Sequence, residues 1–327
     1  MKKTLSVLLA LVLGITCMTA CSSKTVTQED DTKLQIVTTI FPEYDWVMNV
    51  LGDNPADAEV TMLLDNGVDL HSFQPTAEDI LKVSTCDVFI YVGGESDSWV
   101  EDALKEAENG NMVVINLLEA LGDSVKEEEL VEGMQGEEEE EDEGEEEEIE
   151  YDEHVWLSLQ NASVLVNSIS DALEKADPEN AGVYEKNASA YIAQINALDE
   201  EYKAAVAEGG KDTLLFGDRF PFRYLVDDYN LNYYAAFVGC SAETEASFET
   251  ITFLADKLDE LGLPAVLTME GNDQKIAQTI IQNTQTKNQK VLTLDSMQSV
   301  TAKDVEKGVT YLSVMESNLE VLKEALK

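Results

Sequence analysis

The sequence predicts an α/β protein with two parallel-sheet lobes, joined by a long rigid helix and enclosing a cleft. Two observations lead to this prediction. Short β-type runs alternate with helical segments before residue 160 and again after residue 211, an order typical of mostly parallel sheets. Between these regions, residues 177–207 keep a helical spacing of apolar side chains. About 30 residues at about 1.5 Å each make a rod of roughly 45 Å, which can run along both lobes.

The N-terminus has the pattern of a secretory signal. Two lysines precede an apolar stretch at 5–15, and small residues then lead to Cys21. The stretch is too short to span a membrane. A cysteine directly after small residues resembles the lipobox of bacterial lipoproteins, in which that cysteine becomes the lipidated first residue. We therefore expect a signal peptide at 1–20, a lipidated tether at 21–33 and an extracytoplasmic protein held to the cell membrane by its lipid alone.

The N-terminal α/β lobe is expected at 34–160. Its β-type runs are short and apolar, and the segments between them carry apolar residues at helical spacing. In such sheets ligands bind beyond the carboxyl ends of the strands, where Gly93 and Gly94 end one strand and His71 follows another. We expect strands at 33–39, 58–64, 88–94 and 112–117, and helices at 41–50, 76–84 and 99–108.

An acidic block interrupts the end of this lobe. The chain carries a formal net charge of −45, and 18 acidic residues without any Lys or Arg lie between Glu127 and Glu153. Such a run repels itself and buries little apolar area, so we predict a disordered insertion at 127–150. It is either a solvated loop without a role or a weak collector of cations. The strong negative charge argues against nucleic acid and anionic lipid surfaces as partners.

A helical linker at 161–210 and a C-terminal α/β lobe at 211–327 follow. The sequence Asp177-Pro178-Glu179 is a good helix start, with an N-cap acid and proline at the first helical position. The glycine pair Gly209-Gly210 ends that helix. In the second lobe we expect strands at 213–218, 232–239, 264–270 and 291–295, and helices at 223–229, 247–261, 273–285 and 305–326.

The chain contains only two histidines, His71 and His154. A lone surface histidine is usually just a solvated polar residue. Each of these, however, lies between an apolar run and a turn or helix start, where a rigid scaffold can aim a side chain into a cleft. Imidazole is also the commonest metal-ligating side chain. Two imidazoles do not close a metal site, so other ligands must come from elsewhere in the chain.

Three expected strands of the second lobe end in an acid, at Asp218, Glu270 and Asp295. Each acid alone could be only the N-cap of the next helix. Together they would meet at one sheet edge, facing the two histidines across the cleft. Two imidazoles and two carboxylates suit tetrahedral Zn²⁺ or a site of higher coordination for Mn²⁺. The sequence therefore predicts a metal cleft between the lobes.

Two cysteines remain after the predicted signal and lipid anchor, Cys86 and Cys240. An exported protein can pair its cysteines, but these two fall in different predicted lobes. We therefore favour two buried free thiols, and Cys240 could also approach the metal.

Several motifs carry a family resemblance over residues 34–327. They are LHSFQPTAEDI, YVGGESDSWVEDAL, DEHVWLSLQNA, FGDRFPFRYLVDDYNL and VLTLDSM. The chain resembles the metal-binding lipoproteins of zinc and manganese ABC importers, also called adhesin-type lipoproteins. In that family the third-ligand motif typically holds His in zinc binders and Glu in manganese binders, whereas this chain has Asp218. The loop before the second histidine, often His-rich in zinc importers, is acidic here.

The resemblance implies that His71, His154, Asp218 and Asp295 hold one divalent ion, with Glu270 as a neighbouring or helix-capping acid. It implies a monomeric, non-enzymatic protein that captures the ion outside the cell and delivers it to an ABC permease. Zinc is favoured because it exceeds manganese in affinity for almost any nitrogen and oxygen site, and because a short aspartate chelates poorly with both oxygens. The alternatives are a manganese importer component, a metal-dependent adhesin, or an enzyme in which Asp218 or Glu270 acts as a base beside zinc.

Overall fold

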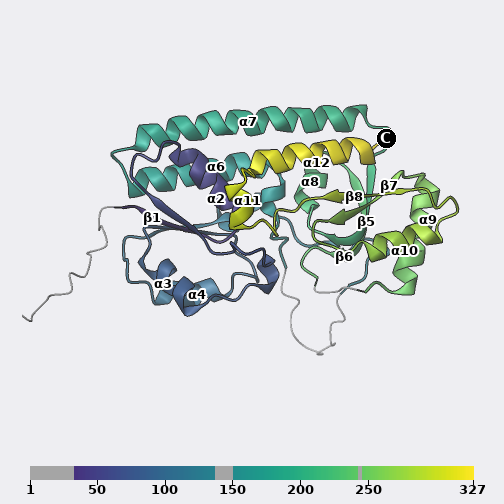
Figure 1. Ribbon diagram of the computed structural model, residues 1–327, viewed down its shortest axis with the longest axis horizontal. Coiled ribbons are helices and arrows are strands. Elements are labelled where there is room, and N and C mark those ends of the chain that lie inside the picture. The colour runs from purple at the N-terminus through teal and green to yellow at the C-terminus, as the bar shows by residue number, and fades with distance from the viewer. Residues whose placement is uncertain (1–32, 137–149, 242–244) are drawn as a thin grey trace, which may run out of the picture. The chain divides into compact units, whose positions relative to one another are not determined.

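Two four-stranded parallel sheets form the framework of the protein, as Figure 1 shows for the computed structural model. The structure describes residues 33–136, 150–241 and 245–327. Both sheets belong to one compact unit that runs from Leu34 to Lys327. The predicted α/β class with two parallel sheets is confirmed. The first sheet has the order β2-β1-β3-β4 and the second the order β6-β5-β7-β8. Their strands are β1 (Gln35–Thr38), β2 (Glu59–Met62), β3 (Val88–Tyr91), β4 (Val113–Asn116), β5 (Thr213–Phe220), β6 (Asn232–Val238), β7 (Ala265–Met269) and β8 (Lys290–Leu294).

Polar side chains satisfy free backbone N–H groups at the start of several helices of the first lobe. Thr76 and Asp79 form a reciprocal capping box at the start of α3. At the start of α2, the buried carboxylate of Glu43 accepts the backbone N–H groups of Thr39 and Ile40. These helices are α2 (Phe41–Leu51), α3 (Ala77–Thr85), α4 (Trp99–Lys105) and α5 (Leu117–Leu121), with short 3-10 turns η1 (Leu70–Ser72), η2 (Gly122–Ser124) and η3 (Val155–Leu157).

The long helix α7 (Ala181–Glu208) has 28 residues and confirms the predicted rod. The predicted start at Asp177-Pro178 is wrong, because Asp177 ends the preceding helix and α7 begins at Ala181. It packs against α2, against α6 (Leu159–Ala176) and against α12 (Tyr311–Ala325), alongside which it runs in Figure 1. Buried tyrosines fix this packing. The Tyr202 hydroxyl donates to the Met315 carbonyl at 2.7 Å, and the Tyr191 hydroxyl donates to Asp45 on α2 at 2.8 Å. The helix therefore contacts elements from both ends of the chain.

The second lobe contains α8 (Arg223–Asp228), α9 (Phe248–Leu261), α10 (Lys275–Asn283) and α11 (Ala302–Glu306). The single terminal helix predicted at 305–326 is wrong at its start. Gly308 adopts a φ of 92°, which breaks the helical path after α11. Thr310 then caps a new helix, α12, by accepting the Ser313 N–H. The helical spacing of apolar residues continues across this break, so the sequence pattern predicted a single helix.

The acidic block is also different from the prediction over its first part. Residues 127–136 contact the second lobe instead of forming a disordered insertion. The Gln135 N–H donates to the Ala236 carbonyl at 2.9 Å, next to the edge strand β6. Glu129 pairs with Arg223 at 2.9 Å, and Met134 is buried. We call residues 126–136 the strap. Residues 137–149 lie outside the described residues.

The predicted signal peptide and nearly all of the tether fall at residues 1–32, which also lie outside the described residues. Within the described ranges, every helix is too short or too polar to cross a membrane.

The packing of the strap against the rest of the protein can be tested directly. Replacing Met134, which is 8% exposed and belongs to the main core, with alanine should lower the free energy of unfolding by about 2 kcal/mol or more. Leu130 of the same strap is 61% exposed, so Leu130→Ala should change it by less than about 0.5 kcal/mol. Urea unfolding of both variants measures the difference. Equal, negligible effects would mean that the strap does not pack.

A second test concerns Asp45, which is buried between α2 and α7. Burial raises the pKa of this carboxyl to about 6, although Tyr191 donates a hydrogen bond to it. Because the folded-state pKa lies above the ordinary value of 3.8, stability is lost as pH rises through 6, by up to about 3 kcal/mol. An asparagine cannot ionise. Asp45→Asn should therefore gain about that much relative to wild type between pH 4 and pH 7 in urea unfolding, and a constant difference would contradict the prediction.

Candidate metal centre

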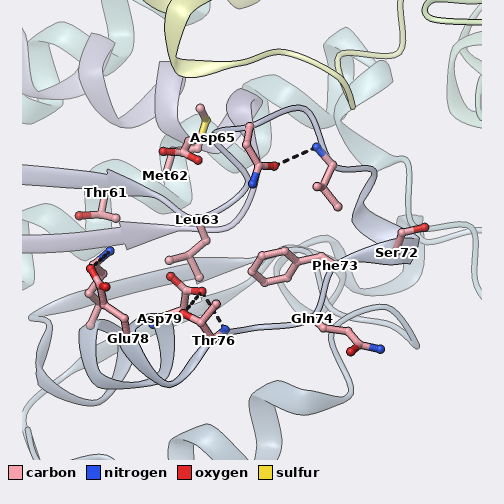
Figure 2. A pocket seen from close by; sticks show the side chains of 13 residues that line it. Thr61, Met62, Leu63, Asp65, Ser72, Phe73, Gln74, Thr76, Glu78 and Asp79 are labelled. Atoms are coloured by element: carbon pink, nitrogen blue, oxygen red, sulfur yellow. Dashed lines mark hydrogen bonds and ion pairs between the residues drawn. The ribbon is translucent and has the colours of Figure 1, made fainter.

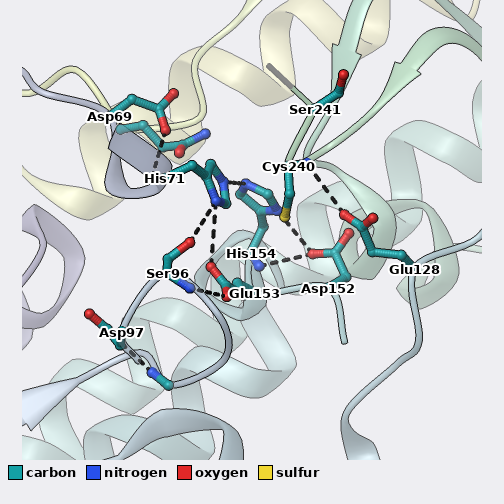
Figure 3. Close-up of polar contacts among 12 residues, drawn as sticks. Asp69, His71, Ser96, Asp97, Glu128, Asp152, Glu153, His154, Cys240 and Ser241 are labelled. Atoms are coloured by element: carbon teal, nitrogen blue, oxygen red, sulfur yellow. Dashed lines mark hydrogen bonds and ion pairs between the residues drawn. The ribbon is translucent and has the colours of Figure 1, made fainter. Parts of the chain in front are cut away.

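His71 lies in the 3-10 turn η1, in the loop that follows β2. Its backbone N–H donates to Asp69 Oδ1 at 3.0 Å, which starts the turn and fixes the position of the imidazole. The ring Nδ1 lies 2.8 Å from the hydroxyl of Ser96 and 3.5 Å from a carboxylate oxygen of Glu153 (Figure 3). With acceptors on the Nδ1 side, the Nε2 atom is left facing His154.

His154 is fully buried, immediately before η3. One oxygen of Asp152 accepts two hydrogen bonds from His154, one from the backbone N–H at 2.8 Å and one from the ring Nδ1 at 3.0 Å. A carboxylate accepts hydrogen bonds and does not donate them, so the network assigns the proton to Nδ1 and the lone pair to Nε2. This carboxylate–imidazole arrangement orients metal-ligating histidines in many proteins.

The Nε2 atoms of His71 and His154 lie 3.1 Å apart. Two nitrogen lone pairs at that distance repel unless a proton or a metal cation lies between them. Two Zn–N bonds of about 2.0–2.1 Å at a tetrahedral angle would separate the nitrogens by about 3.3 Å. The imidazoles therefore already have nearly the spacing that a tetrahedral ion requires.

Cys240 brings a third donor atom to this point. Within the described residues, His71, His154 and Cys240 form the one group of three or more His, Cys, Asp or Glu whose ligand atoms all lie within 4.8 Å of one another. Cys240 follows Gly239 directly after β6, and its backbone N–H donates to Glu128 of the strap at 3.3 Å. Cys86 and Cys240 are both free thiols, as the sequence favoured, but Cys86 alone of the two is buried and Cys240 is partly exposed.

Asp218, the predicted third ligand, lies outside this group. The strand β5 continues through Phe220, so Asp218 lies within the strand and not at its end. A register shift between Phe216 and Arg219 marks a bulge there, and such a bulge re-aims side chains. One carboxylate oxygen accepts the Met269 N–H and the other accepts the Arg219 N–H, both at 2.9 Å. Both oxygens of Asp218 are thus engaged by backbone N–H groups of the second sheet.

Asp295 also lies outside the group, although it follows β8 at the expected sheet edge. Its Oδ1 accepts the Met297 N–H at 2.8 Å. Burial and then the nearby Glu270 raise the pKa of Asp295 to about 6. Glu270 itself accepts the backbone N–H and the hydroxyl of Ser296 at 2.7 and 2.8 Å, so it caps the turn after β8.

The electrostatics of the two imidazoles differ. Burial and then the neighbouring His154 lower the pKa of His71 to about 3, so His71 is neutral at physiological pH. Burial opposes the charged form of His154, but the adjacent Asp152 outweighs it and raises the pKa of His154. Burial and the Glu128 carboxylate raise the pKa of the Cys240 thiol, which stays protonated unless a metal displaces the proton.

Carboxylates surround the centre. Asp152 and Glu153 are each only 3% exposed, and Glu128 lies beside Cys240. Asp69 pairs with the guanidinium of Arg219 from the second lobe at 2.7 Å, whereas Asp152 and Glu153 lie beside the two imidazoles. The site therefore carries an excess of buried negative charge that a divalent cation would balance.

A separate hollow of about 470 Å³ lies beside the His71 loop, between β2 and α3 (Figure 2). Its walls are mostly polar and include Asp65, Asp79 and Lys82. It contains none of the three donor residues, so it is distinct from the metal centre.

Two parallel-sheet lobes held by a long helix, with donor groups converging from both, define the class of two-lobed solute-binding proteins. Residues 36–325 match the family described as ZnuA, zinc-uptake complex component A, periplasmic, and the chain belongs to this family.

Curated relatives agree with this membership. The chain is 32% identical over 322 residues to the zinc-binding lipoprotein AdcA of Streptococcus pneumoniae, covering 98% of this chain and 61% of that protein. It is 30% identical over 311 residues to the high-affinity zinc uptake system protein ZnuA of Bacillus subtilis, covering 94% and 93%. The chain thus spans about 61% of the length of the streptococcal relatives that it matches.

A solved structure shares the fold. The Zn(II)-bound ZnuA-like domain of Streptococcus pneumoniae AdcA superimposes with a TM-score of 0.69 at 29% identity. The match covers 90% of this chain and 99% of that domain.

The Asp152–His154 contact predicts a measurable effect on metal binding. Asp152→Asn weakens the acceptor for His154 Nδ1 and should lower zinc affinity by about 10- to 100-fold, the usual cost of losing such a partner. Asp123→Asn, at an exposed position in η2, is the matched control and should leave affinity unchanged. Competition with a chromogenic chelator measures both, and equal affinities would contradict an orienting role for Asp152.

Proposed function

We propose that this protein captures a divalent transition-metal ion outside the cytoplasm, with zinc as the favoured cargo, and passes it to an ABC permease. The principal support is the pair of imidazoles whose Nε2 atoms face each other at 3.1 Å while acceptors engage both Nδ1 atoms. The names of the relatives, which describe zinc binding and zinc uptake, agree with this cargo.

The choice of zinc over manganese follows from the donor atoms. Neutral imidazole suits zinc, and zinc exceeds manganese in affinity for nitrogen-containing sites unless geometry intervenes. The sequence-based argument from the short side chain of Asp218 no longer applies, since Asp218 is engaged elsewhere. Manganese remains the alternative cargo, and a manganese site would require more oxygen ligands than the described group supplies.

The ligand set of this proposal differs from the predicted one. His71 and His154 are retained. Asp295 is retained as a proposed fourth ligand, because it follows β8 at the carboxyl edge of the second sheet and a single one of its oxygens, Oδ1, accepts the Met297 N–H. Asp218 would have to release two backbone N–H groups to reach an ion, which makes it a poor ligand.

The proposed role is binding and release, without catalysis. The donors come from both lobes, so the ion is held at their junction, and this suits a cargo that must be taken up and given away. A hydrolytic zinc site would keep one position for water and place a general base beside it. Turnover of ester or peptide substrates by the zinc-loaded protein would favour that enzymatic alternative.

The cellular setting is likewise a proposal. The sequence pattern before Cys21 supports lipidation of that residue and attachment to the outer face of the cell membrane. We propose a monomer that meets the permease through its metal-bearing face. Nucleic acid is excluded as a partner on the grounds of a net charge of −45.

One tightly bound ion per chain is the first expectation. His71→Ala combined with His154→Ala should abolish it, since two of the proposed ligands are lost. Asp218→Asn is the matched control and should keep full metal content, because the structure assigns Asp218 to the backbone of the sheet. Elemental analysis of dialysed protein gives the stoichiometry.

Three results would contradict the proposed site, the exclusion of Asp218 or the choice of zinc. Full metal content in the double histidine variant would refute the site. Loss of metal in Asp218→Asn alone, with the fold retained by circular dichroism, would restore Asp218 as a ligand. Manganese outcompeting zinc in the wild-type protein would overturn the choice of cargo.

A further inference from the structure

Cys240 belongs to a loop that is built against the metal centre. A Cβ atom on the preceding residue, Gly239, would lie 3.0 Å from His154 Cε1 and 3.2 Å from His154 Nδ1. The backbone of the loop therefore touches the imidazole, and any larger residue at position 239 would push the loop away. This close approach is an observation independent of the cysteine itself.

Two further contacts hold the same loop. The Cys240 N–H donates to Glu128 of the strap, and the Ser241 carbonyl accepts a hydrogen bond from Arg219 at 3.4 Å. The same Arg219 pairs with Asp69, whose other oxygen starts the His71 turn. One guanidinium thus ties the loop of Cys240 to the loop of His71, and Figure 3 shows the thiol directed toward the imidazoles.

The spacing of the donors suits a single ion. At a tetrahedral centre with Zn–S of about 2.3 Å, the sulfur lies about 3.6 Å from each nitrogen. The Sγ and both ring nitrogens lie within 4.8 Å of one another, and the two Nε2 atoms are 3.1 Å apart. Shortening each sulfur–nitrogen separation from at most 4.8 Å to about 3.6 Å, a change of about 1.2 Å, would bring all three donors onto one ion.

The other cysteine differs in every one of these respects. Cys86 is 1% exposed, and its thiol donates to the Val83 carbonyl at 3.3 Å within the core of the first lobe. It belongs to no group of potential metal ligands among the described residues. Cys86 is therefore the natural control for Cys240.

We propose that Cys240 binds the cargo as a thiolate and makes this site selective for zinc and softer ions over manganese. The inference rests on the proposed function and specifies its third ligand. A thiolate prefers soft and borderline ions such as Zn²⁺ and Cd²⁺, whereas manganese prefers carboxylate, carbonyl and water. On binding, the Sγ–H bond breaks, the metal–sulfur bond forms and the proton leaves to solvent or to a nearby carboxylate. No electron transfer is involved.

The test compares wild type, Cys240→Ser and Cys86→Ser, each loaded with Co²⁺ in place of zinc. A cobalt–thiolate bond gives a charge-transfer band in the near ultraviolet that oxygen and nitrogen ligands do not give. Wild type and Cys86→Ser should show this band, and Cys240→Ser should lack it. In chelator competition, Cys240→Ser should lose zinc affinity by about 100-fold or more, since lost outer partners alone cost about 10- to 100-fold. Its manganese affinity should change by less than about 10-fold.

A second measurement uses the wild-type protein alone, in case Cys240→Ser folds poorly. Alkylation by iodoacetamide, followed by mass spectrometry, should be slowed by zinc at Cys240 and should not respond to zinc at Cys86. Equal alkylation of Cys240 with and without zinc would overturn the proposal.

The possible failures are distinguishable. Tight zinc binding without a thiolate band, unchanged in Cys240→Ser, would overturn the thiolate ligand and leave the proposed metal capture intact. A wild-type protein that binds neither zinc nor cobalt would overturn the proposed function and this inference together.

Discussion

The hydrogen bond from His154 Nδ1 to Asp152 is the interaction on which the metal centre depends. It fixes a fully buried imidazole with its Nε2 lone pair directed at His71. The segment that carries both residues is itself held from several sides. The Asp152 carbonyl accepts the hydroxyl of Tyr224 at 2.8 Å, and its N–H donates to the Lys126 carbonyl of the strap at 2.9 Å. The second lobe and the strap thus position His154, the proposed ligand from the first lobe.

The negative charge around the site favours the binding of a cation. Buried carboxylates beside two imidazoles destabilise one another in the absence of a cation, and burial raises the pKa of Glu153 and Glu128 as it does for Cys240. A divalent ion between the two Nε2 atoms would relieve that repulsion. Binding strength therefore comes from the ligands and from the charge that surrounds them. The chain's net charge of −45 extends the same preference for cations to longer range.

The sequence predicted the regular elements well because apolar periodicity and capping residues are local signals. All eight strands and the long helix lie close to their expected positions. The histidines were predictable because the chain has only two. Contacts between distant segments could not be predicted from the sequence in this way. The burial of Met134 depends on a partner surface in the second lobe that local composition does not reveal, and the acidity of its neighbours suggested disorder. Gly308 could have signalled the break between α11 and α12.

The predicted third ligand, Asp218, and the proposed one, Cys240, stand at similar places in neighbouring strands. Asp218 lies at a bulge two residues before β5 ends, while Cys240 lies beyond the end of β6. At the carboxyl edge of a parallel sheet, the residue past the last ladder bond faces the cleft. By that criterion the sequence Gly239-Cys240 was the stronger candidate. The end of β5 instead supplies Arg219, which joins the loops of His71 and Cys240. The loop after β6 therefore carries the proposed donor Cys240, and the neighbouring strand β5 carries Arg219, which bonds to the loops of both Cys240 and His71.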